Sequence, residues 1–126
     1  MSGKKVLLVD DEVAFTASLG KVLSRRGFEV ETASDGLTAL ARIVKESFDV
    51  IVLDVKMPGM DGIQVLAEIK RLALDLRVIL LTGHLSITDE ETGLQEGAFA
   101  YLIKPVPIQK LVSVIESAAA GGVNKE

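Results

Sequence analysis

The sequence contains no cysteine and no tryptophan, and it has only one tyrosine and one histidine. Without cysteine, disulfide bonds and thiolate metal sites are excluded, and we expect a reducing, cytoplasmic setting. No apolar run approaches the roughly 20 residues that cross a membrane, so we expect neither a membrane segment nor a signal peptide. The net charge is −4 and no basic run exceeds two residues, which argues against direct nucleic-acid binding.

The 126 residues suggest one domain, and the sequence has no internal repeat. We expect residues 1–120 to form this domain and residues 121–126 to be a tail or the start of a linker. Continuous apolar runs predict buried strands at 6–9, 50–53 and 78–81, and a short strand is expected at 98–103. Residues 28–32 alternate apolar and polar side chains, which is typical of a strand at a sheet edge.

Between these strands, apolar residues recur at helical spacing. The first helix is expected to start at residues 10–12 and to stop at Gly27. After an N-cap at Asp35, the second helix is expected to bury a stripe formed by Leu37, Leu40, Ala41 and Val44. A helix over about 86–96 is weakened by Gly93, and Pro107 suits the first position of the last helix.

Strands that alternate with helices predict an α/β fold with a parallel sheet covered on both faces. With the alternating second strand at an edge, the expected architecture is a single five-stranded sheet of order 2-1-3-4-5, doubly wound in the flavodoxin-like (βα)5 manner. In such sheets, sites form beyond the carboxyl ends of the strands, between strands 1 and 3.

Polar residues stand at these carboxyl ends. Asp10 and Asp11 end the first strand, Asp54 the third, Thr82 the fourth and Lys104 the fifth. Carboxylates about 4 Å apart repel by roughly 4 kcal/mol at an effective dielectric near 20, so such a cluster either raises a pKa or holds a cation. All-oxygen ligands favour a hard ion, Mg²⁺ before Ca²⁺. A carboxylate beside Mg²⁺, a lysine and a hydroxyl is a plausible acceptor for a phosphoryl group.

Each of these residues also has an ordinary structural explanation when it is taken alone. The Asp10–Asp11 pair could cap a helix, Asp54 could be a loop acid, and Lys104 could be a solvated charge. Their joint position at one predicted edge of the sheet favours a functional site.

Four segments resemble the receiver domain of two-component response regulators: LLVDDE at 7–12, LDVKMPGMDG at 53–62, LTG at 81–83 and GAFAYLIKP at 97–105. The resemblance covers about residues 4–120. It implies that Asp54 accepts a phosphoryl group from the phosphohistidine of a histidine kinase or a histidine phosphotransfer protein. It further implies Mg²⁺ held by Asp10, Asp11, Asp54 and the Lys56 carbonyl, with Asp10 acting largely through water.

Further roles follow from the same resemblance. Thr82 and Lys104 would bind phosphoryl oxygens, and Thr82 and Tyr101 would form a switch pair. The Lys104–Pro105 bond is expected to be cis. The output face would comprise the fourth helix, the fifth strand and the fifth helix, with self-association as one possible output. The donor would dock near Ala14, Phe15, Ser18 and Pro105.

The sequence departs from the family at Val106, where many receivers carry Phe. Lys56 and His84 stand at positions that tune phosphoryl lifetime in the family. A receiver is not a conventional enzyme, because it catalyses only its own phosphorylation and dephosphorylation. Two alternatives are a Mg²⁺-dependent phosphohydrolase working through an aspartyl-phosphate, and a phosphorylation-independent interaction module. Lys56, two residues after Asp54, is a poor general acid or base, which argues against the first. The intact acids, Thr82 and Lys104 argue against the second.

Overall fold

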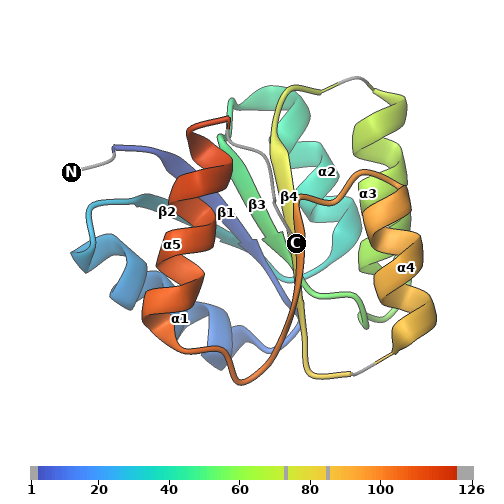
Figure 1. Cartoon of the computed structure of the whole chain (residues 1–126). Coiled ribbons are helices and arrows are strands. Elements are labelled where there is room, and N and C mark those ends of the chain that lie inside the picture. The colour runs from blue at the N-terminus through green and yellow to red at the C-terminus, as the bar shows by residue number, and fades with distance from the viewer. Residues whose placement is uncertain (1–2, 73, 85, 122–126) are drawn as a thin grey trace.

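The part of the chain that the structure describes forms five strands and five helices in strict alternation (Figure 1). The computed structural model describes residues 3–72, 74–84 and 86–121. The strands are β1 (Lys5–Val9), β2 (Glu29–Ala33), β3 (Val50–Leu53), β4 (Arg77–Thr82) and β5 (Ala100–Ile103). The helices are α1 (Val13–Arg25), α2 (Gly36–Lys45), α3 (Gly62–Arg71), α4 (Ile87–Gln95) and α5 (Ile108–Ala119). The expected tail at 121–126 lies, apart from Gly121, outside the described residues.

All strands are parallel in the order β2-β1-β3-β4-β5, which confirms the predicted topology. The register pairs Val9 with Leu53 and Leu53 with Leu80. The carboxyl ends of β1, β3 and β4 therefore lie side by side at one rim of the sheet. This rim is where the polar strand-end residues were expected.

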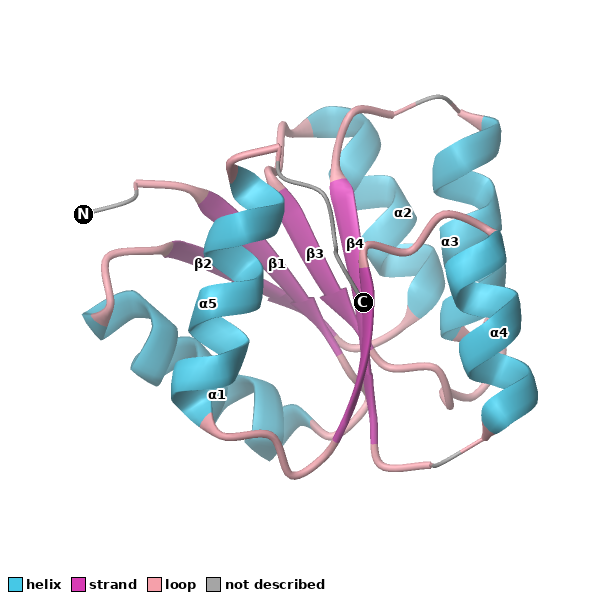
Figure 2. Ribbon diagram, viewed as in Figure 1, coloured by secondary structure: helices cyan, strands magenta, loops and turns pink. Residues whose placement is uncertain are grey.

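Helices cover both faces of the sheet: α1 and α5 lie on one face, and α2, α3 and α4 on the other (Figure 2). Alternate residues of each central strand enter the two cores. Leu7, Ile51 and Leu80 pack toward α2 and α3, whereas Leu8 and Val52 pack toward α1 and α5. Burial on both faces is the physical reason why these strands read as continuous apolar runs.

The expected buried stripe of α2 is wrong. Leu37 is 69% exposed and Val44 is 59% exposed, and Ala41 also faces solvent. The buried side is formed instead by Gly36, Ala39 and Ile43, with Leu40 half-buried. Both stripes have helical spacing, so periodicity does not separate them. Packing distinguishes the two stripes, because only a small residue fits at position 36. A Cβ there would lie 2.9 Å from the Met60 carbonyl oxygen.

The helix starts show one confirmed cap and two shifted positions. Asp35 caps α2 by accepting the Thr38 N–H at 2.7 Å. The first helix begins at Val13 with Glu12 as its N-cap, slightly later than expected. Pro107 is likewise the N-cap of α5 rather than its first helical residue. The proline ring is tolerated at either position, since the first backbone N–H groups of a helix have no partner within it.

Gly93 is buried where α4 meets the sheet. A Cβ at this position would lie 2.6 Å from Cδ1 of Leu80 and 3.4 Å from Cδ1 of Ile63. The glycine therefore permits close approach of α4 to β4, a packing reason that the sequence pattern did not reveal.

The two ends of the described chain lie at the amino-terminal rim of the sheet. The Gly3 N–H donates to the Gly27 carbonyl just before β2. Gly121 lies beside the guanidinium of Arg77, the first residue of β4. Among the described residues, no helix is both long and apolar enough to cross a membrane.

Candidate functional site

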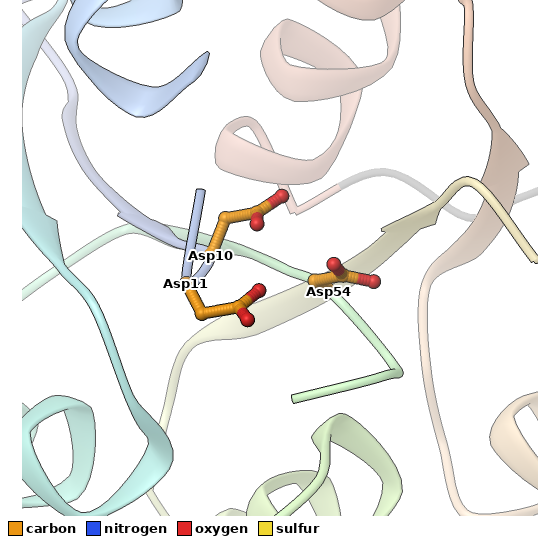
Figure 3. A group of neighbouring side chains, drawn as sticks. All are labelled: Asp10, Asp11 and Asp54. Atoms are coloured by element: carbon orange, nitrogen blue, oxygen red, sulfur yellow. The ribbon is translucent and has the colours of Figure 1, made fainter. Parts of the chain in front are cut away.

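Three carboxylates converge at the carboxyl-terminal rim (Figure 3). Asp10 and Asp11 follow β1, and Asp54 follows β3, the strand next to it. Each offers one oxygen atom, and these atoms all lie within 4.8 Å of one another. Asp10 and Asp54 are buried, with 3% and 6% of their surfaces exposed, whereas Asp11 faces solvent.

The polar side chains at the carboxyl ends of three neighbouring strands are each oriented by the same type of local hydrogen bond. In each case a side-chain oxygen accepts the backbone N–H two residues later, as Asp and Thr do in tight turns. The Glu12 N–H donates to Asp10 Oδ1 at 2.9 Å, and the Lys56 N–H donates to Asp54 Oδ1 at 3.2 Å. In the same way, the His84 N–H donates to Thr82 Oγ1 at 3.2 Å. These turns leave the other carboxylate oxygens of Asp10 and Asp54 available to the centre of the site.

Lys104 reaches this centre from the end of β5. Its Nζ lies 2.6 Å from Asp10 Oδ2 and 3.8 Å from Asp54 Oδ2. The backbone N–H of Lys104 donates to the Thr82 carbonyl at 2.8 Å, and the bond to Pro105 is cis, as expected. Burial by itself lowers the pKa of Lys104, but the Asp10 hydrogen bond and the nearby carboxylates outweigh it, and the net pKa is raised. The ammonium group is therefore a fixed positive charge beside Asp54.

The surroundings of Asp54 raise the pKa of its carboxyl group. Burial is the largest cause, and the charge of Asp10 adds to it. The Thr82 hydroxyl, the charge of Lys104 and the Lys56 N–H lower this pKa and so act in the opposite direction. Asp54 is thus poorly hydrated and flanked by one hydroxyl and one ammonium group, an arrangement that suits a carboxylate that reacts.

The donor set fits a hard divalent cation. Among the described residues, three carboxylates face the Lys104 ammonium group, so the centre carries excess negative charge that a cation would neutralise. Their oxygen atoms are the ligands that Mg²⁺ prefers, and few protein ligands leave room for water. The Lys56 N–H orients Asp54, while the Lys56 carbonyl remains a predicted ligand.

Thr82 and Tyr101, the expected switch pair, are both buried, with 0% and 7% exposed. The Tyr101 hydroxyl donates to the His84 carbonyl at 3.4 Å, and Thr82 accepts the His84 N–H. The pKa of Tyr101 is raised by burial and, to a smaller extent, by Asp89, Glu90 and Asp54. The residues after β4 therefore join the tyrosine to the rim of the site.

The expected docking residues divide into two groups. Phe15 and Pro105 line an apolar groove of about 190 Å³ between α1 and α5. Ala14 and Ser18 are exposed residues of α1 and do not line it. Val106, where the family often has Phe, is half-buried in the same groove.

Sequence reasoning did not find two electrostatic contacts at this site. Glu12 lies 3.5 Å from Lys104 Nζ. Lys56 Nζ lies 3.2 Å from Asp89 Oδ2, which links the loop after Asp54 to α4. The acid run at 10–12 was a signal for the first contact. The second joins segments far apart in sequence, and no pattern marks it.

With this geometry in place, the family is clear. The response regulator receiver domain matches residues 6–116, and the chain belongs to this family. The transcriptional regulatory protein TcrA of Mycobacterium tuberculosis is 36% identical over 122 residues, which cover 97% of this chain and 48% of the relative. The chain thus spans about half the length of the curated relatives it matches.

Solved structures agree with this assignment. A receiver domain from Clostridium thermocellum superposes with a TM-score of 0.88 and is 37% identical, with coverage of 94% of this chain and 95% of that one. A response regulator from Burkholderia pseudomallei, determined with a phosphorylated aspartic acid, a calcium ion and citrate, has a TM-score of 0.84 and is 30% identical. That match covers 94% of this chain and 69% of the other.

Proposed function

We propose that Asp54 accepts a phosphoryl group from the phosphohistidine of a histidine kinase or a histidine phosphotransfer protein. The observation that carries this proposal is a buried carboxylate at the end of β3, with two further carboxylates, Thr82 and Lys104 around it. An Asp54 oxygen attacks phosphorus, the phosphorus–nitrogen bond breaks, and the electron pair leaves with the donor imidazole. The similar Burkholderia structure with a phosphorylated aspartic acid supports this reaction.

Several residues at the rim would together stabilise the negative charge of the phosphoryl oxygens. Asp10, Asp11, Asp54 and the Lys56 carbonyl would hold Mg²⁺, which supplies positive charge to offset that of the phosphoryl oxygens. Lys104 Nζ and the Thr82 hydroxyl would donate to these oxygens, as both already lie next to Asp54. Such donors stabilise the charge of the transferring group without forming bonds to phosphorus.

The acyl phosphate carries more negative charge than the carboxylate it replaces and has more acceptor oxygens. Lys104 and Thr82 would therefore interact more strongly with the phosphorylated state, and this difference would shift the equilibrium at α4, β5 and α5. Tyr101 and His84 provide the contact between the rim and this face. Self-association through the same face is one output that would follow.

The donor would approach from the side of α1 and the β5–α5 loop, near Ala14, Phe15, Ser18 and Pro105. The apolar groove beside Lys104 supports this direction, since it leads to the lysine. We place the reaction in the cytoplasm and expect no direct nucleic-acid contact from this acidic domain.

Acetyl phosphate with Mg²⁺ tests the assignment without a protein donor. The wild type should gain about 80 Da, the mass of one phosphoryl group, in a linkage that hydroxylamine cleaves. Asp54→Ala should gain nothing. Asp75 is an exposed carboxylate before β4, and Asp75→Ala should react like the wild type.

Two further measurements test the metal site and the switch. Asp11→Ala should weaken Mg²⁺ binding. Phosphorylation should change amide exchange within residues 83–105.

A labelled Asp54→Ala protein would refute the acceptor. Repeated turnover of a generic phosphomonoester would favour the phosphohydrolase, and a wild type that remains unlabelled would favour the interaction module. Unchanged exchange within residues 83–105 would remove the proposed switch but leave the acceptor in place.

A further inference from the structure

Besides its carboxylate partners, Lys104 contacts an uncharged aromatic side chain, that of Phe15. Its Nζ lies 4.2 Å from the centroid of the Phe15 ring, well within the range in which an aromatic face attracts a cation. The lysine side chain is only 16% exposed, so water screens this attraction little. Phe15 belongs to the first turn of α1, where its N–H donates to the Glu12 carbonyl at 3.0 Å.

The position of Phe15 joins the inside of the site to its outer surface. Phe15 lines the small cavity that Asp10 and Asp54 also line. It also lines the outer groove, together with Lys104 and Pro105. Phe15 therefore stands between the acceptor and the surface from which a donor would approach.

We propose that Phe15 is a positioning residue for Lys104, and that the electron-rich face of its ring holds the ammonium group at the mouth of the acceptor site. This inference rests on the proposed function. Asp10, the closest partner of Lys104, is also a proposed metal ligand, and a carboxylate shared with a cation holds the lysine less firmly. The ring binds no metal and does not titrate, so its attraction for Lys104 persists while the carboxylates change partners.

Two simpler roles for Phe15 make different predictions. If the ring only fills space, any apolar residue of similar volume will serve. If it only contacts the donor protein, its replacement will not affect phosphorylation by a small molecule. A positioning role instead depends on the electron density of the ring, whichever phosphoryl donor is used.

Fluorinated phenylalanines separate these roles, because each fluorine withdraws density from the ring face and changes its shape little. We would incorporate phenylalanine with one, two and three fluorines at position 15 and measure Asp54 phosphorylation by acetyl phosphate with Mg²⁺. The rate should fall stepwise, by about two- to thirtyfold at three fluorines, the range that the loss of a cation–π contact predicts. The affinity for beryllofluoride, a phosphoryl mimic, should fall in the same order, while the far-ultraviolet circular dichroism spectrum of the fold stays unchanged.

Phe48 is a matched control, because Lys5 Nζ lies 4.9 Å from its centroid at the opposite end of the sheet. The same fluorine series at Phe48 should leave the phosphorylation rate unchanged. A flat series at Phe15, with normal phosphorylation of the wild type, would overturn the positioning role. A decline seen with a phosphohistidine protein but not with acetyl phosphate would also overturn it, in favour of docking. A wild type that does not react at all would instead overturn the proposed function.

Discussion

The substitution Gly93→Ala should have two opposing effects on stability, one on the helix propensity of α4 and one on its packing against the sheet. Alanine is the better helix former by about 1 kcal/mol, so propensity alone predicts a more stable protein. The new Cβ would lie 2.6 Å from Cδ1 of Leu80, which is fully buried. Carbon atoms prefer separations of about 3.5–4.0 Å, so α4 or Leu80 must move by roughly 1 Å.

Such overpacking typically costs about 1–3 kcal/mol. After the gain of about 1 kcal/mol in helix propensity is subtracted, we expect Gly93→Ala to lose up to about 2 kcal/mol of unfolding free energy. Gly20→Ala in α1 is the matched control, since its Cβ would meet Val30 at 3.5 Å and Leu8 at 3.9 Å, both ordinary contacts. This variant should gain about 1 kcal/mol, so the two variants should differ by the packing cost alone, about 1–3 kcal/mol.

Urea unfolding of both variants measures this difference through the midpoints, provided that the m-values agree. The reasoning would be refuted if Gly93→Ala proved as stable as Gly20→Ala. That result would mean that α4 approaches the sheet less closely than the structure indicates, and that its glycine serves flexibility instead of packing.

Two further predictions concern charged side chains. Lys56 and Asp89 should show a coupling of about 0.2–1 kcal/mol in a cycle of Lys56→Gln and Asp89→Asn, since the lysine is half exposed. Urea unfolding at low and high salt measures it, and a coupling that salt does not weaken would contradict an exposed ion pair. Hydrogen bonds from Arg42 and then Lys5 lower the pKa of Glu46 from 4.5 to about 2. Because the folded pKa is the lower one, this stabilisation is present above pH 4.5 and is lost as the pH falls toward 2. The stability difference between wild type and Glu46→Gln should therefore close over this range, and a difference independent of pH would argue against these bonds.

The strands and their order in the sheet could be predicted from the sequence because the strands differ in their hydrophobic patterns. Continuous apolar runs identified the strands buried on both faces, and the alternating pattern of residues 28–32 placed β2 at the edge. The buried side of α2 was not predictable in the same way. Two stripes share its spacing, and the choice depends on the contact of Gly36 with Met60, two residues from separate elements.

The site was predictable to the extent that strand ends determine it. In a parallel sheet, the residues at the carboxyl ends of the strands must lie at one rim, which brings Asp10, Asp54 and Thr82 together whatever their rotamers. The contact of Phe15 with Lys104 depends instead on how α1 packs and on which way a long side chain turns. The Lys56–Asp89 pair likewise depends on the position of α4. Periodicity and strand order carry no information on either contact.

The placement of both described chain ends at the amino-terminal rim has a practical consequence. Gly3 and Gly121 lie near Gly27 and Arg77, at the opposite end of the strands from Asp54. A fluorophore, an affinity tag or a tether to a sensor surface attached at Gly3 or Gly121 would not obstruct the rim that carries Asp54, the proposed acceptor. Such an immobilised protein could be exposed to phosphoryl donors in flow, with each cycle of labelling and hydrolysis followed on the same molecules.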